Sequence, residues 1–293
     1  MPLAFDLRKL DMTYKTLLTC QELDSITNST DLLIVDCRFN LVNTSLGESE
    51  YDSGHIPDAI YAHLDNDLSG AIIPGKTGRH PLPEVDELNR LFSSWGINES
   101  TQVVAYDDAG GPFAARLWWM LRWIGHDKVA VLDGGWKQWV TEARDVSQSE
   151  KTLIQSNFVS KINPTMLANA DDVIVALDNR IVSLLDARTY DRFCGENEML
   201  DAKAGHIPGA ISAPFIDNLY DHGEFKDKRE LAALYKEKTA NNKGEDIVVY
   251  CGSGVTAAHD ILAMEYCGIS GAKLYAGSWS HWITDDSRPI STG

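Results

Sequence analysis

The sequence contains no apolar run that approaches the roughly 18 residues needed to cross a membrane, and it contains few cysteines. Its first residues, MPLAFDLRKL, lack the continuous apolar segment and cleavage site of a secretory signal. The five cysteines are scattered and form no CxxC pair, so neither a zinc site nor a disulfide framework is predicted. We therefore expect a cytoplasmic protein with reduced thiols and no membrane attachment.

Basic residues are also few: the sequence has 26 Lys and Arg against 43 Asp and Glu, which gives a net charge of -17. Such a surface repels phosphate backbones and anionic lipids, so we expect no nucleic-acid partner. At 44% hydrophobic and 24% charged residues, the composition is that of a soluble globular protein. The length of 293 residues is at the upper limit for one core and predicts two domains.

Four short motifs occur twice in the same order. The pairs are LIVDCR and LLDAR, GHIPDA and GHIPGA, VVAYD and IVVYC, and AVLDGGW and KLYAGSW. The members of the pairs are separated by similar distances, between 143 and 151 residues. Such a preserved order and spacing indicates a tandem duplication. We expect a first domain over 1–145, a polar, Ser-rich linker over 146–164, and a second domain over 165–293.

Each half alternates short runs rich in Val and Ile with helical stretches. The runs LLIVD, QVVAYD and KVAVLD are typical of buried strands. Residues 112–124 predict a helix that starts at Pro112 and ends before Gly125, and residues 256–267 predict its counterpart. The fold class is therefore α/β, with a mostly parallel sheet flanked by helices in each half.

The two halves differ chemically at one equivalent position. Aligning VVAYDDAGGPFAA with VVYCGSGVTAA places Asp107 in the first half opposite Cys251 in the second. Both residues follow a predicted strand, where open α/β sheets bind their ligands. A duplicated enzyme that retains one working site would show this difference, and we predict that Cys251 is a nucleophile. The alternative is that Cys251 is a small buried residue at a strand end.

The loop after Cys251 favours a thiolate. Gly252 and Gly254 allow a tight turn with inward-facing N–H groups, and a predicted helix starts near Thr256 and points its positive end at the same place. These amides would also stabilise a persulfide or the anionic oxygens of a substrate. We therefore predict that Gly252, Gly254, Val255 and Thr256 bind substrate. We expect the other cysteines to be packing residues, with Cys194 a weaker candidate for the site.

The paired HIPDA and HIPGA motifs and the loop YCGSGVTAA resemble the two-domain rhodanese superfamily over nearly the whole chain. Within it, CGSGVTA is similar to the active-site loop of 3-mercaptopyruvate sulfurtransferases. The resemblance implies that Cys251 carries sulfur as a persulfide and that Arg192, in DARTYDRF, binds the anionic group of the donor. A salt bridge at the surface or between domains is the structural alternative for Arg192.

The same resemblance implies a Ser–His–Asp set that spans the domains. Ser253 matches the loop serine, while His80 in GRHPLP and Asp65 in HLDND match its partners. Either of the last two could instead be an ordinary loop residue. His55 and His206 occur in the duplicated motif, and we expect them to fix the turn that follows it.

The predicted function is sulfur transfer from 3-mercaptopyruvate, through a Cys251 persulfide, to thioredoxin, glutathione, another thiol or cyanide. No metal or organic cofactor is expected. Thiosulfate:cyanide sulfurtransferase is the main alternative, because the family's second substrate arginine is missing and only Lys203 offers a cation there. A cysteine phosphatase is disfavoured because Ala257 stands where its Cys-x5-Arg loop needs arginine. A non-catalytic module is the expectation for the first domain.

Overall fold

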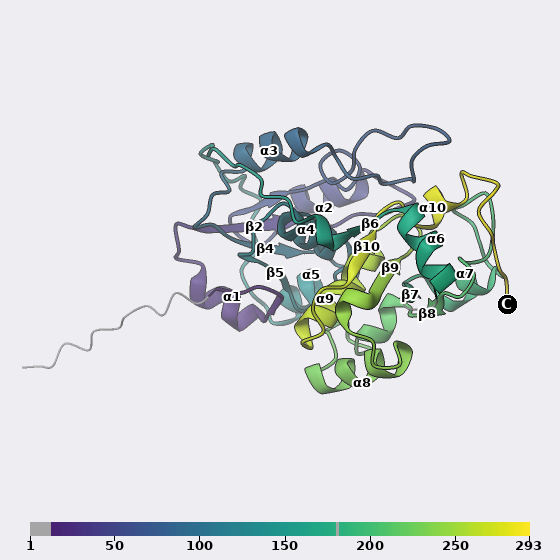
Figure 1. Ribbon diagram of the computed structural model, residues 1–293. Helices are drawn as coiled ribbons and strands as arrows, with labels where there is room; N and C mark the ends of the chain where they lie inside the picture. Colours follow the sequence, from purple (N-terminus) through teal and green to yellow (C-terminus); the bar gives the residue numbers. More distant parts are fainter. Residues whose placement is uncertain (1–12, 180–181) are drawn as a thin grey trace, which may run out of the picture.

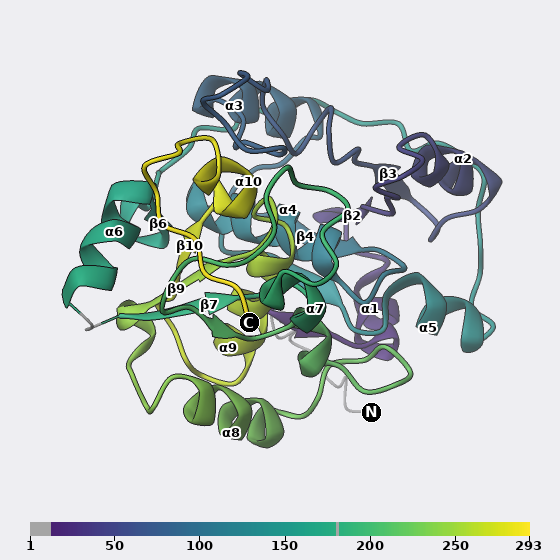
Figure 2. The ribbon, with the colours of Figure 1, turned by 90° about the vertical axis from the view of Figure 1, so that its right-hand side faces the viewer.

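The computed structural model describes residues 13–179 and 182–293. These residues form two five-stranded parallel sheets, with strand orders β1-β5-β4-β2-β3 and β6-β10-β9-β7-β8. The second order repeats the first, strand for strand. Figure 1 shows the two sheets with helices around them, and Figure 2 shows the second domain from its outer side. The predicted fold class is confirmed.

The first domain contains five helices and five strands within its described residues. In chain order they are β1 (Leu17–Leu18), α1 (Cys20–Ile26), β2 (Leu32–Asp36), α2 (Leu46–Ser53), β3 (Ala59–Tyr61), α3 (Val85–Ser94), β4 (Gln102–Tyr106), α4 (Pro112–Trp123), β5 (Val129–Leu132) and α5 (Gly135–Thr141).

The second domain repeats this plan and adds three 3₁₀ turns in the residues described. Its elements are η1 (Pro164–Met166), β6 (Leu167–Ala168), α6 (Ala170–Asn179), β7 (Ser183–Asp186), α7 (Tyr190–Cys194), β8 (Ile211–Ser212), η2 (Phe215–Asn218), α8 (Lys228–Lys238), η3 (Gly244–Asp246), β9 (Ile247–Tyr250), α9 (Thr256–Tyr266), β10 (Lys273–Tyr275) and α10 (Ser278–Trp282).

The helices α4 and α9 occupy equivalent places after the central strands β4 and β9. Helix α4 starts at Pro112, whose ring fits the first helical turn, and ends just before Gly125 at φ +93°. Helix α9 runs from Thr256 to Tyr266, with Gly268 at φ +91° after it. Both predicted helices are confirmed to within one residue.

The largest hydrophobic core spans both domains. It joins side chains of the first sheet, such as Val103, to side chains of the second, such as Val249, through α4 and α9. These two helices pack against each other between the sheets (Figure 1). Trp118 and Trp119 on α4 are fully buried, as expected for packing rather than for a ligand-stacking surface. The domains are therefore joined by apolar burial.

A buried ion pair is repeated in the two domains. Asp36 pairs with Arg38 at 2.6 Å, and Asp186 pairs with Arg188 at the same distance. Each arginine is almost completely buried and also donates to a glycine carbonyl oxygen of the duplicated GHIP motif. The equivalent pairs fix the strand ends to the same loop in both halves.

His55 and His206 also occupy equivalent places. The Nδ1 atom of His55 lies 2.8 Å from the carbonyl oxygen of Tyr51, and that of His206 lies 2.8 Å from the carbonyl oxygen of Phe193. Each histidine forms an isolated antiparallel bridge, His55 with Ser147 and His206 with Ser291. These contacts favour the predicted role in holding the turn.

The segment between α5 and η1 contains no helix or strand beyond the isolated bridge at Ser147. The exact domain limits at 145 and 164 stay predictions. Across residues 13–179 and 182–293, no helix is both long and apolar enough to cross a membrane.

Candidate active site

Cys251 follows the last residue of β9, at the carboxyl edge of the second sheet. Its N–H donates to Ser278 Oγ at 3.0 Å, and its carbonyl oxygen accepts the N–H of Trp279 at 2.9 Å. Both partners lie at the start of α10, so the backbone of Cys251 is held on two sides. The residue is only 2% exposed. Nearby side chains that reach solvent include those of Arg79 and Arg192.

The loop turns its amides toward the thiol, as predicted from its glycines. The N–H of Gly254 donates to Cys251 Sγ at 3.1 Å. Gly254 has φ +81°, and a Cβ there would lie 2.5 Å from the carbonyl oxygen of Ala276. Only glycine fits this position. Helix α9 starts at Thr256, and its positive end therefore faces the sulfur.

The first domain shows what this loop can bind, because Asp107 occupies the equivalent position there. Its carboxylate accepts four backbone N–H bonds, from Ala109 and Gly111 at 2.9 and 2.8 Å and from Phe113 and Ala114 at 2.9 and 3.0 Å. Burial raises the pKa of Asp107 to about 6, and the N–H groups act in the opposite direction. The first domain thus fills its own anion site.

Three of the four equivalent amides of the second domain are open, while the fourth, that of Ala258, donates to the carbonyl oxygen of Val255 at 3.1 Å. With the offset of 144 residues between Asp107 and Cys251, the matching N–H groups include those of Ser253, Val255 and Ala257. Within the described residues, none of these three has an acceptor. A buried N–H group without a partner is costly, so the loop is prepared to bind an anion.

The predicted Ser–His–Asp set comes together across the domain interface. His80 Nδ1 lies 2.7 Å from Ser253 Oγ, and His80 Nε2 lies 3.2 Å from Asp65 Oδ1. The first domain contributes His80 and Asp65, and the second contributes Ser253. The imidazole is buried, whereas the Asp65 side chain is 38% exposed.

The His80 imidazole is neutral. Burial, together with the positive charges of Arg116 and Arg79, lowers its pKa to about 3. With the Asp65 carboxylate accepting from Nε2–H, Nδ1 is the acceptor for the Ser253 hydroxyl. Neutral His80 can therefore accept a hydrogen bond from the Ser253 hydroxyl and orient that group for proton transfer.

Arg116 is a buried arginine that sequence reasoning missed. It donates to the carbonyl oxygens of Gly254 at 3.3 Å, His80 at 3.1 Å and Leu68 at 3.3 Å. Burial lowers its pKa to about 10, while nearby Cys251 raises it. Arg116 lies on α4, whose sequence predicts an ordinary buried helix. Nothing in the sequence therefore distinguishes Arg116 from a packing residue. It ties the His80 segment to the loop that follows Cys251.

Arg192 lies beside the loop, as the resemblance implies. A Cβ added at Gly252 would lie 3.4 Å from Arg192 Nη1. The guanidinium is held by Glu198, through Nε at 3.1 Å and Nη2 at 2.9 Å, and by Asp201 at 3.0 Å. The geometry of Arg192 is compatible with both the salt-bridge alternative and the substrate role. Its ion pairs use Nε and Nη2, so Nη1 still faces the loop.

Arg79 is the second guanidinium at this place, and it was missed. A Cβ at Gly252 would lie 2.9 Å from Arg79 Nη2. Arg79 Nη1 pairs with Asp201, and its backbone N–H donates to Ser280 Oγ at 3.1 Å. Its place directly before His80 in GRHPLP is a signal that could have pointed to it.

Lys203 does not take the place of the missing substrate arginine. Its ammonium pairs with Asp286 at 2.6 Å, and its carbonyl oxygen accepts the indole N–H of Trp279. Cys194 is buried at the end of α7, and all five cysteines are free.

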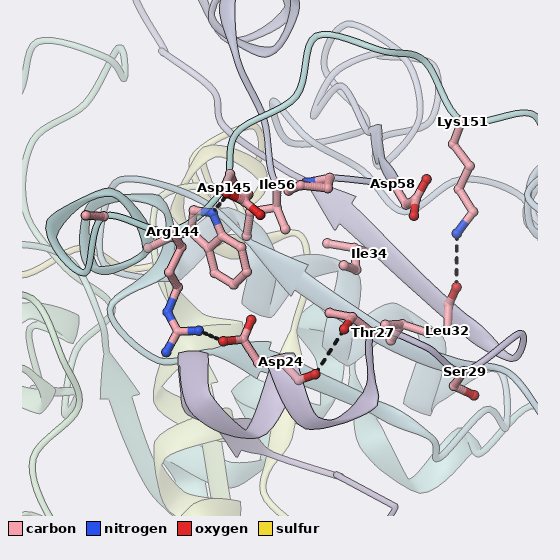
Figure 3. Close-up of a pocket in the computed structure, with 13 residues that line it drawn as sticks. Asp24, Thr27, Ser29, Leu32, Ile34, Ile56, Asp58, Arg144, Asp145 and Lys151 are labelled. Atoms are coloured by element: carbon pink, nitrogen blue, oxygen red, sulfur yellow. Dashed lines mark hydrogen bonds and ion pairs between the residues drawn. The ribbon is translucent and has the colours of Figure 1, made fainter.

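A separate cavity of about 380 Å³ lies in the first domain and contains none of these residues (Figure 3). Its cations are already paired, Arg144 with Asp24 and Lys151 with the carbonyl oxygen of Leu32. This cavity therefore offers no unpaired cation to a ligand among its described lining residues.

The family profile described as Rhodanese-like domain matches twice, over residues 19–142 and 169–285. The chain belongs to the rhodanese family. The two matches fall on the two sheets, so both halves are rhodanese domains, and only the second has cysteine at the loop position.

Relatives of this rhodanese-family chain carry two kinds of name. A probable 3-mercaptopyruvate sulfurtransferase of Pseudomonas aeruginosa is 42% identical, over 96% of this chain and 100% of that protein. A putative thiosulfate sulfurtransferase, SseB, of Mycobacterium tuberculosis is 36% identical over 95% and 98%. The crystal structure of the 3-mercaptopyruvate sulfotransferase SseA from Escherichia coli matches with TM-score 0.78 and 29% identity, covering 91% of this chain and 100% of that one.

Proposed function

We propose that the protein is a sulfurtransferase that takes sulfur from 3-mercaptopyruvate, holds it as a persulfide on Cys251 and passes it to a thiol or to cyanide. The observation that carries this proposal is the loop after Cys251, which directs the Gly254 N–H at Sγ and leaves three further amides open, with the Ser253–His80 pair alongside. The name and 42% identity of the Pseudomonas aeruginosa relative support the same donor.

In the first half-reaction, the Cys251 thiolate attacks the sulfur of 3-mercaptopyruvate and an S–S bond forms. The C–S bond breaks, and its electron pair leaves on pyruvate as an enolate. Ser253 delivers a proton to the enolate carbon, and the acidic persulfide S–H returns one proton to the Ser253–His80 pair. The products are pyruvate and the Cys251 persulfide anion, which the loop amides stabilise.

In the second half-reaction, the acceptor attacks the outer sulfur and the Cys251 thiolate leaves. Thioredoxin, glutathione and cyanide are acceptors with suitable chemistry. These two half-reactions predict ping-pong kinetics and require no metal or organic cofactor. The first domain contributes His80 and Asp65 but no nucleophile, since Asp107 fills its loop.

Thiosulfate is the second donor to consider, because the Mycobacterium tuberculosis relative carries that name. Its leaving group, sulfite, needs no protonation at carbon, so it would make little use of Ser253 and His80. The two donors should be compared by kcat/KM with excess cyanide as the acceptor. We expect 3-mercaptopyruvate to be preferred by at least about tenfold. A preference for thiosulfate would overturn the donor assignment while leaving Cys251 as the nucleophile.

We also propose a cytoplasmic location. The five cysteines are free in the structure, which suits a reducing compartment. Cell fractionation with antibody detection would test this, and recovery in an oxidising compartment would contradict it.

A further inference from the structure

We propose that Arg79 of the first domain and Arg192 of the second form one clamp for the carboxylate of the sulfur donor, with Asp201 as the positioning residue that holds them together. This inference rests on the proposed function. It assigns substrate binding to an arginine of the domain that lacks the nucleophile.

The two guanidinium groups meet over the residue that follows the nucleophile. A Cβ placed on Gly252 would lie 2.9 Å from Arg79 Nη2 and 3.4 Å from Arg192 Nη1. Gly252 thus leaves room for both groups close to Cys251. An anion bound between these two nitrogen atoms would lie beside the reacting sulfur.

The donor atoms nearest the loop are the ones without partners. Arg192 uses Nε and Nη2 in its ion pairs, and Arg79 uses Nη1. Within residues 13–179 and 182–293, Arg192 Nη1 and Arg79 Nη2 have no acceptor. One carboxylate can accept from both, with one oxygen for each.

Acidic side chains hold the clamp from the other side. One carboxylate oxygen of Asp201 pairs with Arg79, and the other accepts from Arg192 at 3.0 Å. Glu198 binds Arg192 through both of its oxygens. Both acids are nearly completely buried, at 3% and 2% exposure. They offset the repulsion between two adjacent guanidinium groups, and they fix the direction in which the free nitrogen atoms point.

The charges at the clamp favour an anion. Burial and the neighbouring Arg192 lower the pKa of Arg79, whereas Cys251 and Glu198 raise it. Arg79 therefore lies where further negative charge is favourable. A pyruvate-type carboxylate supplies one charge and two coplanar oxygens, which matches the two free N–H directions.

The test compares two donors that differ only in the carboxylate. Binding of 3-mercaptopyruvate and of its neutral analogue mercaptoacetone is measured by calorimetry on the Cys251→Ser variant, with and without Arg79→Ala. We expect Arg79→Ala to weaken 3-mercaptopyruvate binding about 10- to 100-fold and to leave mercaptoacetone binding unchanged. Arg79→Lys should give an intermediate loss, because it keeps the charge without the fork.

Arg122→Ala is the matched control. Arg122 also lies in the first domain and pairs with an acid of the second, Glu265, at 3.7 Å, but it does not approach the loop. This variant should bind both donors as the parent does. In the active enzyme, Asp201→Asn should raise KM for 3-mercaptopyruvate about 3- to 10-fold with kcat within about twofold, and Asp201→Glu should restore part of the loss.

Equal losses for both donors, or no loss for 3-mercaptopyruvate, would overturn the clamp. A parent enzyme that does not turn over 3-mercaptopyruvate at all would instead overturn the proposed function. The two failures are therefore distinguishable.

Discussion

His80 Nδ1 lies 2.7 Å from Ser253 Oγ, although the two residues belong to different domains. The second domain alone therefore holds the proposed nucleophile, Cys251, without the histidine of the proposed proton relay. The packing of α4 against α9 brings the two parts together, and Arg116 links them through carbonyl oxygens on both sides. This arrangement explains why a duplicated chain retains a first domain whose own loop is filled by Asp107.

Removing the proton relay should affect the two donors differently. Ser253→Ala and His80→Gln should lower kcat for 3-mercaptopyruvate by about 10²- to 10⁴-fold, the usual contribution of general acid–base catalysis. The thiosulfate reaction should fall far less, because sulfite leaves without protonation at carbon. Steady-state kinetics with each donor provides the measurement, and thiosulfate is the internal control. Equal losses would contradict a proton-transfer role.

The lowered pKa of His80 predicts a pH-dependent contribution to stability. The unfolded imidazole has a pKa of about 6.5, whereas the folded one is at about 3. Between these values the unfolded state binds more protons, so the contribution is complete above about pH 6.5 and falls as the pH decreases toward 3. The difference in unfolding free energy between wild type and His80→Gln should change by up to about 1.4 kcal/mol per pH unit between about pH 4 and 6.

Urea unfolding of both proteins at several pH values gives this difference. Taking the difference also cancels opposing contributions from other groups, such as Asp107, whose pKa is raised to about 6. A difference that stays constant from about pH 4 to 7 would show that His80 is not held neutral in the folded protein.

Asp107 should stabilise the first domain. Asp107→Ala leaves four backbone N–H groups without an acceptor and should lower the free energy of unfolding by roughly 2 kcal/mol or more. Asp108→Ala is the matched control, since its side chain makes no hydrogen bond among the described residues, and it should stay within about 0.5 kcal/mol of wild type. Thermal or urea unfolding measures both. An equal effect of the two variants would contradict the anion-site interpretation.

The two glycines of the loop should respond differently to alanine. Gly254→Ala places a Cβ 2.5 Å from a backbone oxygen at φ +81°, so it should cost stability and disrupt the N–H bond to Cys251 Sγ. Gly252→Ala meets only the movable ends of Arg79 and Arg192, and it should raise KM while leaving stability close to wild type. Kinetics and unfolding of both variants test this, and the reverse pattern would count against the site geometry.

Much of this site follows from the sequence. The duplication sets Cys251 against Asp107, and the positions of Ser253, His80 and Asp65 follow from the resemblance together with the duplicated motif. The structure places these three side chains in contact across the domains, while their roles in the reaction stay predictions. A repeat preserves order along the chain, so it predicts equivalent positions well.

Arg79, Arg116 and Asp201 did not follow from the sequence. Their roles depend on how the domains dock, and no repeat or local spacing encodes a contact between Arg79 and Asp201. Lys203 illustrates the same limit, because the sequence left open whether it replaces the missing substrate arginine, whereas in the structure its ammonium pairs with Asp286.

The most direct test of the account is mass spectrometry of peptides after treatment with 3-mercaptopyruvate in the absence of an acceptor. The account predicts a gain of one sulfur atom on the Cys251 peptide of the wild type, lost on addition of cyanide. It predicts no gain in Cys251→Ser, nor in that variant with Asp107→Cys added, because the first domain's loop lacks the two arginines and the His80 relay. Sulfur retained on any peptide of Cys251→Ser at the wild-type level would contradict it.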